Sequence, residues 1–337
     1  MSVYAAGLGI GTHNSNAQWL EMFYPQPLLA PNENLAACFR EICGETALDT
    51  KALETLAKQL VDAGQADAGL LAKRLMNSER PVVATLLEED TAPTTVPEGY
   101  LKLHLLSHRL VKPQATNLQG LFGVLPNVAW TDAGAIAIDE LAERQLDARL
   151  RGTTLEVSCV DKFPKMTNYV VPSGVRIAHT ARVRLGAYVG EGTTIMHEGF
   201  VNFNAGTIGP GMIEGRVSAG VLVGADSDLG GGSSTMGTLS GGGDIVISVG
   251  KQCLIGANAG LGIPLGDRCT IESGLYLTAG TKVSMLDASG QPTEQLAARQ
   301  LSGMSDLLFR RNSLSGTVEC LSNKTAAQLN AELHAHN

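Results

Sequence analysis

The feature that most restricts the fold of this chain is a six-residue repeat in its second half. From Val171 onward a β-branched side chain recurs at every sixth position, and a smaller residue follows most of them four places later. The repeated positions are Val171, Ile177, Val183, Val189, Ile195, Val201, Thr207 and Ile213. This repeat is typical of a parallel β-helix, in which three hexads form a triangular coil and the aliphatic side chains stack inside it. A flexible glycine-rich linker does not keep aliphatic residues in step, so that alternative is rejected.

The repeat changes phase three times. It moves first to Val217, Val223 and Leu229, resumes at Val249, Ile255 and Leu261, and resumes again at Leu265, Ile271, Leu277 and Val283. The first shift falls at Glu214, Gly215 and Arg216, and the second spans residues 236–247, which we expect to loop out of a coil. Regular coils present generic surface, so we expect function where the repeat is broken.

The remaining residues divide the chain into three parts. Residues 1–165 alternate helix-like and strand-like segments and predict an α/β domain, residues 166–283 the β-helix, and residues 284–337 a C-terminal arm that ends in a short helix. Together they give a mixed fold class, a β-helix with an N-terminal α/β domain and a C-terminal extension.

Local patterns support the α/β prediction. Leu53, Leu56 and Leu60 share one face of a helix that Asp49 or Thr50 would cap. We expect a second amphipathic helix over residues 134–150 and strands over residues 81–87 and 155–160.

Charge and cysteine content exclude several classes of protein. The net charge of −8 and the absence of a Lys or Arg run argue against nucleic acid as a partner. The chain has no signal-peptide pattern and no apolar run long enough to span a bilayer, so we expect a cytoplasmic protein that is not bound to membranes. Its six cysteines form no CxxC pair and are expected to be buried apolar residues.

Two glutamates are candidates for chemistry. Glu198 and Glu214 are sixteen residues apart, so they should lie in neighbouring coils and face outward, because the interior cannot hold unpaired charge. Glu214 stands at the first phase shift, two positions before Arg216, and an arginine can bind a carboxylate through two hydrogen bonds.

Basic and histidine residues offer further candidates. His179 and His197 are eighteen residues apart and should stack on successive coils, where either could act as a general base or bind a metal. A β-helix zinc site needs three histidines, and only these two fall in the repeat. Arg310 and Arg311 follow the polar excursion and could bind phosphates or remain solvated.

Seven segments resemble the longer form of the tetrahydrodipicolinate N-succinyltransferase family: VDKFPKMTNYVVPSGVRI, MHEGFVNFNAGT, EGRVSAGV, GGGSSTMGTLSGGG, CLIGANAGLGIPLGD, ESGLYLTAGTKV and LLFRRNSLSG. They lie between about residues 158 and 320 and go beyond the hexad pattern. The resemblance implies a left-handed parallel β-helix, which is an exception to the rule that connections between parallel strands are right-handed. It also implies a homotrimer with active sites between prisms, succinyl-CoA as donor, and a step of the diaminopimelate route to lysine.

The resemblance also implies roles for individual residues. Glu214 matches the catalytic carboxylate, and Glu198 matches a position that helps to hold Mg²⁺ on the threefold axis, where three carboxylates would otherwise repel one another. The positions that match the succinyl-CoA and substrate site are Arg216, Gly231, Ser234, Ala257, Glu272, Ser273, Gly280, Arg310, Arg311, Asn312 and Ser313.

The expected chemistry moves an acyl group from a thioester to an amine. Glu214 would take the proton of the amine as a general base, or attack the thioester first as a nucleophile that forms an anhydride. Backbone N–H groups near Gly231 would stabilise the oxyanion. Two alternatives stay open: another hexapeptide-repeat N- or O-acetyltransferase with His197 as its base, and a non-catalytic trimerisation scaffold.

Overall fold

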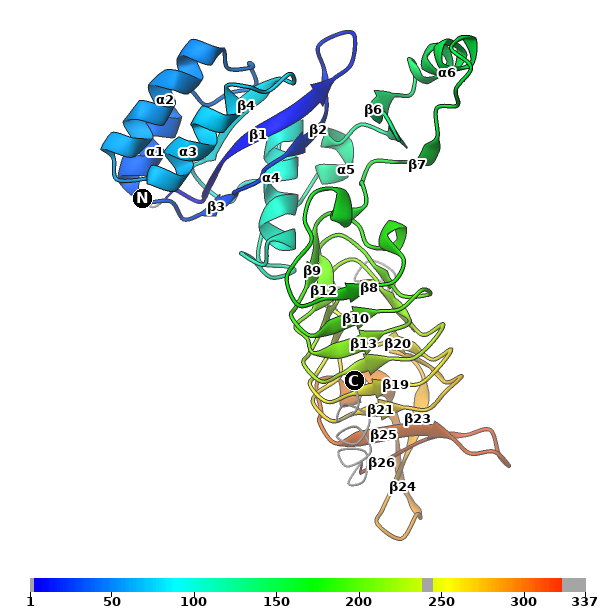
Figure 1. Ribbon diagram of the computed structural model, residues 1–337. Helices are drawn as coiled ribbons and strands as arrows, with labels where there is room; N and C mark the ends of the chain where they lie inside the picture. Colours follow the sequence, from blue (N-terminus) through cyan, green and yellow to red (C-terminus); the bar gives the residue numbers. More distant parts are fainter. Residues whose placement is uncertain (1–2, 238–244, 323–337) are drawn as a thin grey trace. The chain divides into compact units, whose positions relative to one another are not determined.

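A computed structural model describes residues 3–237 and 245–322 and divides the chain into two compact units (Figure 1). The described residues of the first unit are 3–111, 115–164 and 168–170. Those of the second are 112–114, 165–167, 171–237 and 245–322. The helix expected near the C-terminus lies outside the described residues. No helix within the described ranges is long and apolar enough to cross a membrane.

The first unit is built on an antiparallel sheet of four strands. Its central strand β1 pairs with each of the other three, β2, β3 and β4. The strands are β1 (Ala5–His13), β2 (Trp19–Phe23), β3 (Leu28–Leu29) and β4 (Val82–Leu87), and the helices around them are α1 (Glu33–Arg40), α2 (Thr50–Asp62), α3 (Ala66–Leu75) and α4 (Val96–Ser107).

Alternation along β1 gives this sheet two buried faces. Ala6 and Leu8 share a core with apolar side chains of α1, α2 and α3, whereas Gly7 leaves room for Tyr24 and for Leu101 of α4. The three leucines predicted on one face of α2 are all buried, and Asp49 caps that helix by accepting a hydrogen bond from the Ala52 N–H at 2.7 Å.

A second, three-stranded antiparallel sheet completes the first unit. It consists of β5 (Val128–Thr131), β6 (Gly134–Ala137) and β7 (Val157–Asp161), with the helices α5 (Leu121–Val124) and α6 (Leu141–Leu150) beside it in the chain. The helix predicted over residues 134–150 was wrong in its first part. Residues 134–137 pair with β5 instead, because the partner strand satisfies their backbone groups, and the helix begins only at Leu141.

The second unit is a parallel β-helix, visible in Figure 1 as stacked short strands. One face contains β8 (Arg176–Ile177), β10 (Thr193–Ile195), β13 (Gly211–Ile213), β16 (Asp228–Leu229), β19 (Leu254–Ile255) and β21 (Thr270–Ile271). A second contains β11 (Phe200–Val201), β14 (Arg216–Val217), β17 (Ser234–Thr235), β20 (Gly260–Gly262) and β22 (Tyr276–Thr278). The third contains β9 (Ala187–Val189), β12 (Ala205–Thr207), β15 (Leu222–Val223) and β18 (Ser248–Val249).

The predicted ladder forms the interior of this β-helix. Val183, Val189, Ile195 and Val201 are each completely buried, and their counterparts in later coils are buried too. Each such side chain stabilises the fold by about 1.5–3 kcal/mol. Strand pairing also confirms the phase shifts, because Ile195 pairs with Ile213 eighteen residues on, whereas Ile213 pairs with Leu229 sixteen residues on.

Two hairpins follow the coils. The first joins β23 (Lys282–Leu286) to β24 (Pro292–Ala297), and the second joins β25 (Leu307–Arg311) to β26 (Val318–Ser322). β25 pairs in parallel with β21, so the chain returns after the first hairpin to add one more strand to the first face of the β-helix.

None of the six cysteines forms a disulfide. Four are buried as predicted, but Cys43 and Cys159 are exposed, which corrects the expectation that all six would be buried. The buried ones include Cys253 and Cys269 in successive coils.

Candidate active site

One edge of the β-helix gathers most of the predicted site residues. Cα pairing aligns Ile213, Leu229, Ile255, Ile271 and Phe309 on successive strands of one face. The chain turns a corner directly after each of the first four, whereas β25 continues past Phe309 to Arg311. These four corners and the end of β25 stack in a column that we call the Glu214 edge. It comprises residues 214–216, 230–233, 256–259, 272–275 and 310–312. With a strand spacing of about 4.8 Å, the column from Glu214 to Arg310 is about 19 Å long.

The first corner of this edge is shorter than its neighbours. Val217 stands four positions after Ile213, whereas Val201 stands six positions after Ile195. Gly215 sits at the tightest point, where a Cβ would overlap the side chain and the backbone of Ser233. Only glycine fits there, which explains the Glu-Gly-Arg sequence at the phase shift.

Glu214 faces the next coil. Its side chain is half-buried, and a Cβ placed on Gly231 would lie 3.6 Å from its Oε2 atom. Because Gly231 has no side chain, its backbone leaves the space beside this carboxylate open. An acyl carbonyl could therefore approach both Glu214 and the backbone of residues 230–232.

Arg216 lies beside this space with an exposed side chain. Its backbone N–H donates to the Ser233 carbonyl at 2.8 Å, and its Cα pairs with Ser234 in the next coil. The structure thus brings together Glu214, Arg216, Gly231 and Ser234 from two successive coils.

The far end of the edge is polar. The Glu272 carboxylate accepts a hydrogen bond from the Arg311 N–H at 2.7 Å. The Arg310 side chain donates to Glu319 at 3.0 Å, and Asn312 donates to the other oxygen of that carboxylate at 2.8 Å. Arg310 is therefore held by an acid, whereas the Arg311 guanidinium donates to the Gly316 carbonyl at 3.0 Å.

The remaining predicted residues divide between this edge and other places. Ala257 and Ser273 are exposed on the edge, and the Gly274 N–H donates to the Ala257 carbonyl at 2.8 Å. Ser313 is exposed in the turn after β25. Gly280 lies between β22 and β23, after a different corner, and is not part of the column.

Two residues of the column carried no signal in the sequence. Asn258 lies against Gly232, and its backbone N–H donates to the Gly231 carbonyl at 2.9 Å. Ser233 is buried behind Gly215. Asn258 adopts a positive φ of 55°, and a single asparagine in a hexad does not reveal which corner it occupies.

Glu198 and the two histidines occupy the preceding coils, as predicted. Pairing of Phe200 with Arg216 puts Glu198 one coil before Glu214, and pairing of Ile177 with Ile195 stacks His179 under His197. All three side chains are exposed.

These residues do not form a metal site within one chain. The Glu198 carboxylate lies 3.7 Å from the Arg182 guanidinium, so a cation already faces it. No cluster of three potential His, Cys, Asp or Glu ligands occurs among residues 3–237 and 245–322. Glu198 alone does not fit a Mg²⁺ or zinc ion.

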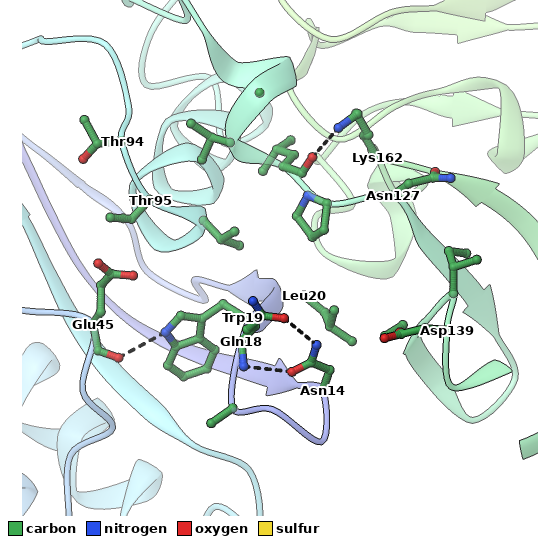
Figure 2. Close-up of a pocket in the computed structure, with 18 residues that line it drawn as sticks. Asn14, Gln18, Trp19, Leu20, Glu45, Thr94, Thr95, Asn127, Asp139 and Lys162 are labelled. Atoms are coloured by element: carbon green, nitrogen blue, oxygen red, sulfur yellow. Dashed lines mark hydrogen bonds between the residues drawn. The ribbon is translucent and has the colours of Figure 1, made fainter. Parts of the chain in front are cut away.

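A separate cavity of about 960 Å³ lies in the first unit and contains none of the predicted site residues. Figure 2 shows that its polar groups bond to one another: Lys162 donates to the Leu125 carbonyl, Asn14 donates to Gln18, and the Trp19 indole donates to the Glu45 carbonyl.

Two family models match the chain. Residues 125–165 match the middle region of tetrahydrodipicolinate N-succinyltransferase, and residues 246–279 match the hexapeptide repeat of succinyl-transferase. The first match lies almost entirely in the first unit and overlaps only one of the seven segments, at residues 160–165.

Whole-length relatives extend this similarity to both units. The chain is 62% identical to a 2,3,4,5-tetrahydropyridine-2,6-dicarboxylate N-succinyltransferase of Pseudomonas aeruginosa, over 100% of this chain and 99% of the relative. The corresponding protein of Vibrio cholerae is 57% identical over the full length of both.

A crystal structure from Campylobacter jejuni, assigned to a 2,3,4,5-tetrahydropyridine-2-carboxylate N-succinyltransferase, has the same fold. It is 32% identical with a TM-score of 0.88, covering 97% of this chain and 94% of that one. The expected left-handed β-helix with an N-terminal α/β domain is thereby confirmed. On this similarity over its whole length, the chain belongs to the tetrahydrodipicolinate N-succinyltransferase family.

Proposed function

We propose that this protein transfers the succinyl group of succinyl-CoA to the amine of ring-opened 2,3,4,5-tetrahydrodipicolinate, a step of lysine biosynthesis through diaminopimelate. Membership of the family supports the reaction. The assignment of this reaction to a site rests on the Glu214 edge. At one end of this column, the Glu214 carboxylate and the Arg216 side chain lie beside backbone that Gly231 leaves uncovered.

The shape of the edge suits an extended acyl carrier. A column of about 19 Å can accommodate a pantetheine arm whose thioester lies at Glu214 and whose phosphates lie toward Arg311. Ala257, Glu272, Ser273, Asn312 and Ser313 would line the path of the carrier, with Arg310 held at its end by Glu319. Arg311 suits a phosphate because its side chain is exposed and its guanidinium donates to the neutral Gly316 carbonyl.

In the proposed reaction the amine nitrogen attacks the thioester carbonyl. A C–N bond forms, the C–S bond breaks, and CoA leaves as its thiol. Glu214 either takes the proton of the amine and passes it to the departing sulfur, or first forms an anhydride that the amine then opens. Backbone N–H groups near Gly231 would stabilise the oxyanion, and Arg216 and Ser234 would hold a substrate carboxylate.

The proposed assembly is a homotrimer, with active sites between neighbouring β-helices and Gly280 contributing from another corner. In such a trimer, three copies of Glu198 could converge on the axis and hold Mg²⁺ in a structural role, provided that Arg182 moves aside. No chemical step depends on that ion. Succinyl-CoA is a cytoplasmic metabolite, so the cytoplasm is the proposed compartment. The proposed domains remain residues 1–165, 166–283 and 284–337.

Release of the CoA thiol tests the proposed reaction. Purified protein is mixed with tetrahydrodipicolinate and either succinyl-CoA or acetyl-CoA, and a serine and an amino-sugar acceptor are run in parallel. Release that requires both succinyl-CoA and tetrahydrodipicolinate is expected. Release only with acetyl-CoA or with another acceptor would contradict the substrate assignment while leaving the fold intact.

A further inference from the structure

A second cavity in the first unit contains a buried acid. It has a volume of about 510 Å³, and the residues that line it all belong to that unit. Its walls come from β1, β2, β5, β6, β7 and the segment around Tyr169, and they include Glu21, Phe23, Arg80, Trp130, Gly134 and Tyr169. None of them belongs to the Glu214 edge, so the proposed acyl transfer does not use this cavity.

Glu21 lines the cavity and is only 5% exposed. Its two oxygens accept hydrogen bonds from the Thr12 hydroxyl at 2.5 Å and from the Tyr169 hydroxyl at 3.0 Å. Burial raises the pKa of this carboxyl, while those hydrogen bonds and Arg80 oppose the rise. Burying a carboxylate costs several kcal/mol unless a cation bonds to it directly, and neither hydroxyl supplies a positive charge.

The nearby cation does not provide that direct bond. The Arg80 guanidinium lies 3.8 Å from the Glu21 carboxylate and donates instead to the Thr12 hydroxyl at 3.1 Å. Its side chain is about half exposed, and a Cβ on Gly134 would lie 3.2 Å from one of its nitrogens. The glycine thus leaves room for the guanidinium where it faces both the cavity and solvent.

Aromatic rings form the apolar part of the wall. Tyr169 packs against Trp130 with ring centres 6.5 Å apart and against Phe23 with ring centres 6.3 Å apart. Such rings favour a nearby cation and an aliphatic chain alike.

We propose that this cavity binds an α-amino acid with an aliphatic side chain. The ammonium group would bond to Glu21 and supply the missing charge. The carboxylate would bond to Arg80, and the side chain would pack on Trp130, Phe23 and Tyr169. The separation of 3.8 Å between the acid and the guanidinium suits the adjacent ammonium and carboxylate of one α-amino acid.

Titration calorimetry of the full chain with L-norleucine tests this proposal. Pentylamine and hexanoate serve as probes that lack the carboxylate and the ammonium, respectively. Norleucine is expected to bind at one site per chain, and each truncated probe at least about tenfold more weakly, because it loses a charged hydrogen bond. Absence of norleucine binding up to about 10 mM would overturn the proposal, as would pentylamine or hexanoate binding as tightly as norleucine.

Variants locate the site. Glu21→Gln and Arg80→Gln are each expected to weaken norleucine binding at least about tenfold. The control variants Glu54→Gln and Arg74→Gln change exposed residues outside the cavity and should bind norleucine like the parent. Because Glu21 is buried, its variant could fail to fold, and Arg80→Gln, at an exposed side chain, keeps the test decisive. Unchanged binding in a folded Arg80→Gln variant would contradict the proposal.

This proposal is independent of the proposed function. CoA thiol release is measured for each variant without amino acid and should equal that of the parent. A failure of acyl transfer in the parent would therefore contradict the proposed function alone. Calorimetry tests the cavity separately, so the two proposals can fail independently.

Discussion

Glu214 and Gly231, seventeen residues apart in the sequence, face each other across neighbouring coils, with the carboxylate Oε2 3.6 Å from the position that a Cβ on Gly231 would occupy. This distance is an ordinary van der Waals contact, and Gly231 does not have a positive φ. A methyl group would therefore fit here without strain, and it would cover one side of the proposed catalytic acid.

Gly231→Ala is predicted to lower turnover without lowering stability. The added methyl would occupy the space proposed for the thioester carbonyl, so kcat should fall at least about tenfold while the free energy of unfolding changes by less than about 0.5 kcal/mol. Urea unfolding and CoA thiol release on the same sample measure both. Gly215→Ala is the contrasting variant, because its Cβ would overlap Ser233, and it should be clearly destabilised. Full activity of Gly231→Ala would show that the reaction occurs elsewhere.

Glu214→Gln is predicted to lower kcat by at least about 100-fold, because the amide can neither take a proton nor form an anhydride. The affinity for CoA, measured by calorimetry, should change much less. Glu198→Gln is the matched control, at an exposed glutamate one coil before the Glu214 edge, and should keep most of the activity. Comparable losses in the two variants would argue against a special role for Glu214.

Cys253 is predicted to be replaceable by serine but not by alanine. Its thiol accepts from the Cys269 N–H at 3.3 Å and donates to the Gly266 carbonyl at 3.2 Å. Ser227, one coil earlier, makes the same pair of bonds to the Cys253 N–H at 2.9 Å and to the Gly250 carbonyl at 2.7 Å. Cys253→Ser should thus stay near the parent stability.

Cys253→Ala should lose about 1–3 kcal/mol, because it leaves two buried backbone groups without partners. Thermal unfolding of the two variants measures the difference. A serine variant as unstable as the alanine variant would show that the sulfur contributes through packing rather than through hydrogen bonds.

Acidification is predicted to destabilise the first unit through His104. Burial, with a smaller effect of the nearby His108, lowers the pKa of this imidazole to about 3, although the hydrogen bond to the Tyr100 carbonyl opposes the shift. The unfolded chain takes up the proton near pH 6.5, and the folded chain only near pH 3. The free energy of unfolding linked to His104 is therefore constant above pH 6.5. It falls as the pH drops from 6.5 toward 3, by up to about 1.4 kcal/mol per pH unit.

His104→Gln should reduce the slope of unfolding free energy against pH between about 6.5 and 4. His179→Gln, at an exposed histidine of the β-helix, should leave that slope unchanged. Equal slopes in all three proteins would mean that His104 does not control the acid sensitivity.

The sequence alone determined the β-helix and the position of its main irregularity. Aliphatic residues in a six-residue step can be buried together only if the chain coils with that period, so Val183, Ile195 and their counterparts specified the interior directly. The shortened corner at Glu214 was visible for the same reason, since two missing residues displace every later member of the ladder. By contrast, the strand pairing of residues 134–137 was missed, because a short apolar segment suits a strand or a helix equally well and the partner strand decides.

Only the tertiary structure decided which residues share the Glu214 edge and the cavity around Glu21. Leu229 and Ile255 are twenty-six residues apart yet pair, and Ile271 pairs with Phe309 after a whole hairpin has intervened. No fixed period therefore relates Glu214 to Arg311. Glu21, Arg80 and Tyr169 likewise come from three distant segments. Periodicity reports contacts between neighbouring repeats, whereas these groups meet through insertions and packing whose lengths follow no repeat.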